Sequence, residues 1–204
     1  MDRAAAGAVA AAIPFLAIVF YVATRAMPPL AGYLFGLAVY WFMVLTPLIL
    51  WRCGFRAVRH ELAWPHFVLI MLNVIPIGGV AVAAFIGWHN HPLNAAVLGA
   101  VVAAALINGT LEEVFWRGTL LRNAQHLASY LSQIALFVSW HIALLFAGGV
   151  VVTGGALGLF GGALIGGILW TWARVQTGSI GFGILCHIGL NLFAFTELAT
   201  NNPI

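Results

Sequence analysis

Seven long apolar segments follow one another along the chain, and they restrict its fold more than any other feature. They run at about residues 4–24, 30–51, 67–87, 95–124, 128–147, 150–173 and 179–198. Each is long enough to cross a bilayer, whose hydrocarbon core takes roughly 20 helical residues. The short segments of alternating polarity that a membrane β-barrel needs are not seen. We therefore predict an all-α fold, a polytopic transmembrane helix bundle of about seven spans.

The composition supports this fold class. Of the 204 residues, 63% are hydrophobic and 6% are charged, whereas soluble domains carry about 25% charged residues. No stretch is long enough for a separate soluble domain, so we expect residues 1–204 to form a single integral membrane domain. The first apolar run exceeds the roughly 7–15 residues of a signal-peptide core, and we expect it to be a retained span.

The arginines predict the orientation, since the chain has no lysine. With seven spans, one side of the membrane holds Arg3, Arg52, Arg56, Arg59, Arg122 and Arg174. The other side holds Arg25. By the positive-inside rule the N-terminus is cytoplasmic. The short, alanine-rich, lysine-free chain favours a prokaryotic cytoplasmic membrane.

Two classes of feature are not expected. The arginines form no continuous basic face, so nucleic acid is not a predicted partner. Cys53 and Cys186 fall in different kinds of segment, so no structural disulfide is predicted.

The stretch "LEEVFWRGTLL" places Glu112, Glu113 and Arg117 in the most apolar region of the chain. A charge at the bilayer centre costs at least about 2.5–3.5 kcal/mol, so such residues are usually functional or paired. Glu113 and Arg117 have the i,i+4 spacing of a helical ion pair. Glu112 is left without this partner. It is either an acid kept neutral by burial or part of a polar site.

Polar residues on two later spans favour the polar site. They are His141 in "FVSWH" and the pair His187 and Asn191, which share a helical face. At about 1.5 Å per residue, Glu112 and His141 both lie roughly 20 Å from the turn that joins their spans. His187 and Asn191 lie roughly 14–20 Å beyond the loop before their span. We predict that all four meet in one intramembrane pocket that opens toward the cytoplasmic side.

These groups suit hydrolysis by an activated water. A carboxylate and an imidazole can deprotonate water, and a histidine with an asparagine amide can donate to an oxyanion. For a site inside the membrane, the natural acyl substrate is a peptide bond. Ser139 and Cys186 point away from the neighbouring histidines, so neither is a convincing nucleophile.

A zinc site is the mechanistic alternative. Glu112, His141 and His187 could supply two histidines and a carboxylate, with water in the fourth position. The H-E-x-x-H motif is absent, and zinc would leave Asn191 without a role. We favour a site with no metal or other cofactor.

Three ordered motifs resemble those of the CPBP family. "EEVFWR" is similar to its E-E-x-x-x-R motif, "FVSWH" to F-x-x-x-H and "HIGLN" to H-x-x-x-N/D. The family includes CAAX prenyl proteases of the Ras-converting type and bacterial immunity and processing proteins, and the resemblance covers a core of about residues 95–195.

The resemblance implies a glutamic-type intramembrane endopeptidase acting on a membrane-associated peptide, either lipidated or carrying a C-terminal tag. It implies Glu112 as general base, His141 as its partner on the water, and His187 with Asn191 as oxyanion stabilisers. Glu113 and Arg117 support them.

Two other functions stay open. The same buried groups could form the proton relay of a proton-coupled transporter, although no inverted repeat is seen. A non-catalytic binding or immunity protein could also use this fold.

A glycine appears at every fourth position in the sixth segment, at Gly154, Gly158, Gly162 and Gly166. This spacing predicts close packing against another helix. The alternative is a smooth wall against which a substrate segment or lipid tail lies.

Overall fold

The computed structural model describes residues 1–52, 54–55 and 58–202. Within these residues it contains helices and no strand, and seven of the helical spans are long and apolar enough to cross a membrane. The predicted all-α transmembrane bundle is confirmed. The predictions that concern Cys53 and Arg56 lie outside the described residues.

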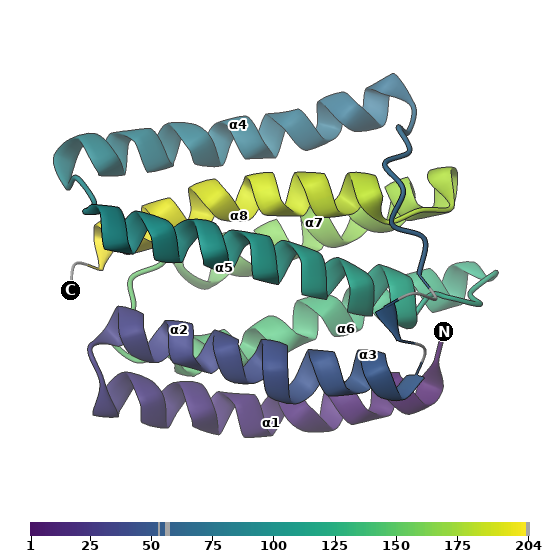
Figure 1. Cartoon of the computed structure of the whole chain (residues 1–204), viewed down its shortest axis with the longest axis horizontal. Helices are drawn as coiled ribbons and strands as arrows, with labels where there is room; N and C mark the ends of the chain where they lie inside the picture. Colours follow the sequence, from purple (N-terminus) through teal and green to yellow (C-terminus); the bar gives the residue numbers. More distant parts are fainter. Residues whose placement is uncertain (53, 56–57, 203–204) are drawn as a thin grey trace.

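The seven spans run side by side along one axis (Figure 1). In chain order the elements are α1 (Arg3–Ala26), α2 (Pro29–Val39), the π-helix η1 (Tyr40–Leu45), α3 (Thr46–Arg52), α4 (Phe67–Asn90), α5 (Ala95–Glu113), the π-helix η3 (Val114–Thr119), α6 (Leu127–Trp140), the 3₁₀-helix η4 (His141–Phe146), α7 (Gly155–Thr177) and α8 (Gly181–Asn201). Three spans are composite: Pro29–Arg52, Ala95–Thr119 and Leu127–Phe146.

Local chemistry sets several helix ends. Asp2 caps α1 by accepting from the amides of Ala4 and Ala5, and it also pairs with Arg52 at 2.8 Å. Asn94 caps α5 in the same way. The sixth span starts at Gly155, later than predicted, because Gly149 and Gly154 before it have φ of 78° and 76°, outside the helical range.

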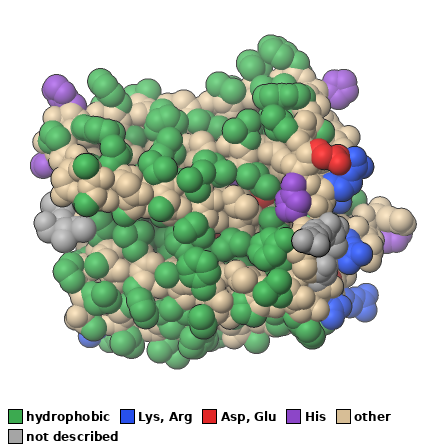
Figure 2. Space-filling view, in the orientation of Figure 1, with side chains coloured by type: hydrophobic (Ala, Val, Ile, Leu, Met, Phe, Trp, Pro, Cys, Tyr) green, Lys and Arg blue, Asp and Glu red, His purple; other side chains and the backbone are tan. Residues whose placement is uncertain are grey.

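The central spans are α5 and α8, which pack against each other. In Figure 1, α4 lies along one edge of the bundle and α1 and α2 along the other. The outer surface is largely apolar in Figure 2, and most of the arginine and acidic side chains visible on that face lie at the end near the N-terminus. We call this the arginine-rich end. Aromatic side chains fill the interior around the level of Glu112, among them Tyr40, Trp116, Phe137 and Trp140.

Candidate active site

The four predicted site residues line one chamber inside the bundle. Its volume is about 460 Å³, and its lining includes Glu112 on α5, His141 at the start of η4, and His187 and Asn191 on α8. The spans therefore bring these side chains together, as their depths in the sequence predict.

Glu112 and Glu113 both lie against His187. The Nε2 atom of His187 is 3.4 Å from Oε2 of Glu112, and its Nδ1 atom is 3.1 Å from Oε1 of Glu113. The sequence pairs Glu112 with His141 and Glu113 with Arg117 alone, whereas the nearest histidine to both carboxylates is His187. A neutral imidazole has one N–H, so a contact at both nitrogens requires a proton shared with a carboxyl group or a protonated ring.

Close packing of α5 and α8 explains this contact. A Cβ atom at Gly109 would lie 2.8 Å from the backbone nitrogen of Ile188. A Cβ atom at Gly183 would lie 2.7 Å from Oε2 of Glu113. The two glycines let the helices approach until the His187 ring reaches the glutamates.

The predicted ion pair between Glu113 and Arg117 is present. Nη1 of Arg117 donates to Oε1 of Glu113 at 2.9 Å, and both side chains are fully buried. The guanidinium carbon also lies 4.3 Å from the ring centre of Phe137 and 5.3 Å from that of Trp170. A buried charge is tolerated when it is paired, and the two ring faces add cation–π attraction.

A π-helix follows the two glutamates directly. In η3 the amide of Leu120 donates to the carbonyl of Phe115, five residues back, and such wide turns are frequent at functional sites. The wide turn places the indole of Trp116 toward the second span, where its N–H donates to the hydroxyl of Tyr40 at 3.0 Å. Sequence spacing alone did not reveal this segment.

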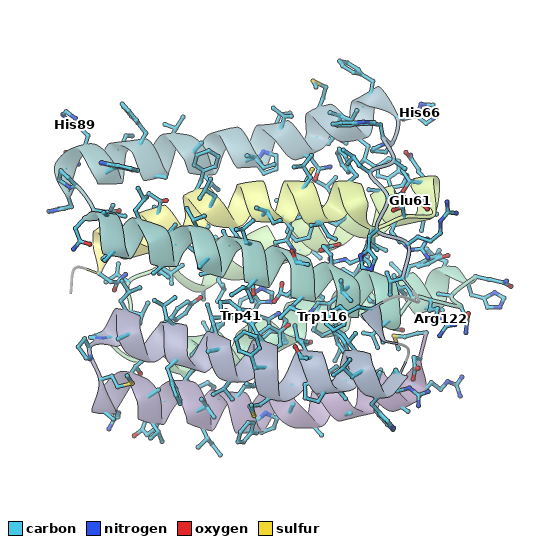
Figure 3. All side chains as sticks on the ribbon, in the orientation of Figure 1. Trp41, Glu61, His66, His89, Trp116 and Arg122 are labelled. Atoms are coloured by element: carbon cyan, nitrogen blue, oxygen red, sulfur yellow. The ribbon has the colours of Figure 1, made fainter. Side chains whose placement is uncertain are left out.

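The second span contributes two aromatic residues that the sequence did not identify. Tyr40 stacks on Trp140 with ring centres 3.9 Å apart, and the indole N–H of Trp41 donates to Asn108 at 2.7 Å. In Figure 3, Trp41 and Trp116 lie near each other where α2 and α5 face each other. An adjacent Tyr–Trp pair in an apolar segment is equally typical of an interfacial aromatic belt, so it gave no signal.

His141 is held in one orientation. Its Nδ1 atom lies 2.9 Å from the carbonyl oxygen of Phe137. Because a carbonyl oxygen only accepts, Nδ1 carries the proton in this bond and Nε2 keeps its lone pair. The ring also packs edge to face against Phe137. His141 therefore offers the chamber an acceptor.

Three polar atoms of chamber-lining residues are buried without a hydrogen-bond partner among the described residues, and one of them is the indole nitrogen of Trp140. The other two are Oε1 of Glu112, an acceptor when the carboxyl is ionised, and Nδ2 of Asn191, a donor. The Asn191 residue is 8% exposed. Buried polar groups are rarely left unpaired, so a ligand that both donates and accepts would complete this site.

The chamber extends in the direction opposite to the predicted one. Beyond Asn191 its lining continues to Val152, Thr153, Glu197 and Leu198, which lie at the end away from the arginine-rich end. The prediction of an opening toward the arginine-rich end is wrong. The number of residues from the nearest loop gives only the depth of each site residue. It does not show which side of the site is filled by side chains and which is left open.

Two layers close the arginine-rich end. The inner layer is the buried group of Trp116, Arg117 and Phe137. The outer layer is the segment 58–66, which crosses that end of the bundle before α4. It is tied to the start of α8, because the amide of Ile180 donates to the carbonyl of Arg59 at 3.0 Å. Glu61, His66 and Arg122 all lie at this end in Figure 3.

The glycines of the sixth span line the chamber. Gly158, Gly162 and Gly166 belong to its wall. A Cβ atom at Gly162 would meet no atom within 4 Å, and one at Gly166 would meet Trp170 of the same helix. The predicted close packing against another helix is therefore wrong at these positions, and the arrangement matches the alternative, a smooth wall.

The three donors of the alternative zinc site line the same chamber, but they are not placed as a metal-binding group. In the described part of the chain, no group of three or more His, Cys, Asp or Glu side chains is placed to hold a metal ion. His187 has both ring nitrogens against carboxylates.

Comparison with protein families shows the family to which the chain belongs. A family model described as type II CAAX prenyl endopeptidase Rce1-like matches residues 92–193, half of the 204-residue chain. The chain belongs to the Rce1-like family. No curated protein and no solved structure matched it. Membership supports a membrane-embedded protease that acts on a peptide substrate.

The Rce1-like match covers all four chamber residues from Glu112 to Asn191. Tyr40 and Trp41 lie outside it, so the second span contacts the matched region from the other half of the chain.

Proposed function

We propose that this Rce1-like chain is a glutamic-type intramembrane endopeptidase. It hydrolyses a peptide bond of a membrane-associated peptide with water activated by Glu112 and His141. One observation carries the proposal: an unpaired acceptor on Glu112 and an unpaired donor on Asn191 line the same buried chamber. A water molecule satisfies the first, and the carbonyl oxygen of a peptide bond satisfies the second.

The first step is attack by water. The water donates one hydrogen bond to Oε1 of Glu112 and one to the Nε2 lone pair of His141. Its oxygen attacks the carbonyl carbon while its proton passes to Glu112, which acts as general base. The former carbonyl oxygen becomes negatively charged and accepts from the Asn191 amide.

His187 is the second donor to this oxyanion. Its Nε2 atom is 3.4 Å from Glu112, longer than a strong hydrogen bond, so the substrate oxygen can replace the carboxylate as acceptor. Glu113 fixes the other nitrogen, and Arg117 fixes Glu113. Both are positioning residues.

Collapse of the tetrahedral intermediate completes the reaction. The C–N bond breaks, and the leaving nitrogen takes the proton held by Glu112. The products are a carboxylic acid and an amine, and Glu112 returns to its ionised form. No metal is needed to balance these steps, and the proposed enzyme uses none.

The test is hydrolysis of candidate peptides by purified protein in lipid nanodiscs. Prenylated CAAX-type peptides and peptides with C-terminal tags are both offered, in water enriched in heavy oxygen. We expect one labelled oxygen in the new carboxyl group with the wild type, and no product with Glu112→Gln. Peptide binding without turnover by the wild type would instead support a non-catalytic binding protein.

A further inference from the structure

A third buried carboxylate lies at the far end of the chamber. Glu197 is 9% exposed and lines the chamber together with Thr153 and Leu198. It follows His187 by ten residues on α8. The steps described above do not use it.

The contacts of Glu197 leave part of its carboxylate free. The Thr153 hydroxyl and the Asn201 amide both donate to Oε1. Oε2 accepts no hydrogen bond from a described residue, and no arginine of the described residues lies within 4.0 Å of the side chain. Burying a carboxylate beside apolar walls without a cation is costly, so a positive ligand group would stabilise it.

The surroundings of Glu197 are held in place. Asn202 makes two hydrogen bonds to Val151, accepting from its amide at 2.7 Å and donating to its carbonyl at 2.9 Å. These bonds tie the loop that carries Thr153 to the end of α8. The carboxylate is therefore presented to the chamber by fixed neighbours.

The distance to the catalytic residues is that of a short peptide. Ten helical residues span about 15 Å, and an extended peptide covers about 3.3 Å per residue. A substrate whose cleaved bond lies at Glu112 would therefore reach Glu197 with the residue about four to five positions away.

We infer that Glu197 forms a specificity subsite that binds a positively charged side chain, lysine or arginine, about four to five residues from the cleaved bond. The inference rests on the proposed function, because it takes the chamber to hold the substrate peptide.

The experiment uses fluorescent apolar peptides in which a single lysine is moved one position at a time, with a lysine-free peptide as reference. Cleavage is measured for the wild type, Glu197→Gln and Glu61→Gln. Glutamine keeps an oxygen for Thr153 and Asn201 and removes only the charge. Glu61→Gln is the matched control, since Glu61 is exposed and paired with Arg59 at the bundle end. The quantity compared is the ratio of kcat/KM for each lysine peptide to the reference, so a general loss of activity cancels.

We expect the wild type and Glu61→Gln to prefer lysine at the fourth or fifth position by about 10-fold, as a close charge pair would give. Glu197→Gln should lose that preference. Equal ratios at every position, or a preference that survives Glu197→Gln, would overturn the inference.

A binding arm separates this inference from the proposed function. The same peptides are titrated against Glu112→Gln with and without Glu197→Gln. If no peptide is cleaved by the wild type but binding depends on lysine position only when Glu197 is present, the protease proposal fails and the subsite stands. If peptides are cleaved but lysine position affects neither cleavage nor binding, the protease proposal stands and the Glu197 subsite fails.

Discussion

The imidazole of His187 contacts Glu112 through Nε2 at 3.4 Å and turns its opposite nitrogen to the adjacent glutamate. Two neighbouring carboxylates therefore share one ring, yet one of them also holds the Arg117 guanidinium and the other keeps an oxygen for the chamber. This asymmetry divides their roles.

Glu112→Gln should remove turnover and leave the fold intact. Glutamine keeps the shape of the side chain but cannot take the proton of water, and general-base catalysis contributes about 10²- to 10⁴-fold. Single-turnover cleavage and thermal unfolding in detergent measure the two effects. Near-normal turnover would contradict the role of Glu112 as base.

Glu113→Gln should lower stability as well as activity. It leaves Arg117 buried without its carboxylate, and removing one partner of a buried pair costs about 3–5 kcal/mol. Arg117→Ala should act similarly. Unfolding in detergent compares both with Glu112→Gln, and equal stability of all three variants would refute this division.

Asn191→Ala should lower kcat with little change in KM. Its amide is a donor that the oxyanion uses most in the transition state, and loss of one such donor costs about 10²- to 10³-fold. Asn73→Ala is the matched control, because Asn73 also lines the chamber but its amide donates to Leu69 of its own helix. Equal effects of the two variants would remove Asn191 from the reaction.

Gly162→Leu should narrow the chamber and lower kcat/KM by about 10-fold or more, as size exclusion in an apolar pocket does. Gly161→Leu is the control. A Cβ atom at Gly161 also meets nothing within 4 Å, but Gly161 is not part of the chamber wall. Both changes add the same helix propensity, so a difference in cleavage reports the wall alone.

Strong chelators should leave cleavage unchanged, and purified protein should contain no stoichiometric zinc by elemental analysis. The reason is that the proposed reaction uses Nδ1 of His187 to contact Glu113, and uses Nε2 of His187 and the Asn191 amide to stabilise the oxyanion. Activity that disappears on chelation and returns with zinc alone would move Glu112, His141 and His187 into a metal site.

The sequence predicts the spans and the convergence of the chamber residues well, because both follow from the number of residues in each helical segment. Apolar run length gives the helices, and residues per turn give the depth of Glu112, His141 and His187. The ion pair of Glu113 with Arg117 follows from i,i+4 spacing in the same way.

The remaining features depend on how side chains of different volume pack together, and the spacing of residues along the sequence gives no information about this packing. Tyr40 accepts a hydrogen bond from Trp116, which lies on the π-helical turn after Glu113, and no regular helical period predicts that turn. The direction of the chamber depends on bulky side chains filling one end. The glycines of α7 have the four-residue spacing that is typical of close helix packing. Only the positions of the neighbouring helices show that these glycines face the chamber.

The closed arginine-rich end has a kinetic consequence. If the proposed cleavage takes place in the chamber, the buried Trp116 and Arg117 and the segment 58–66 leave no through-channel toward that end for a cut peptide. In the proposed protease, incoming peptide and outgoing fragments would then share the rest of the chamber, which extends beyond Asn191 and along α4 and α7. The chamber must then release both fragments before it binds the next peptide. A fragment that dissociates slowly acts as a competitive inhibitor of the uncut peptide.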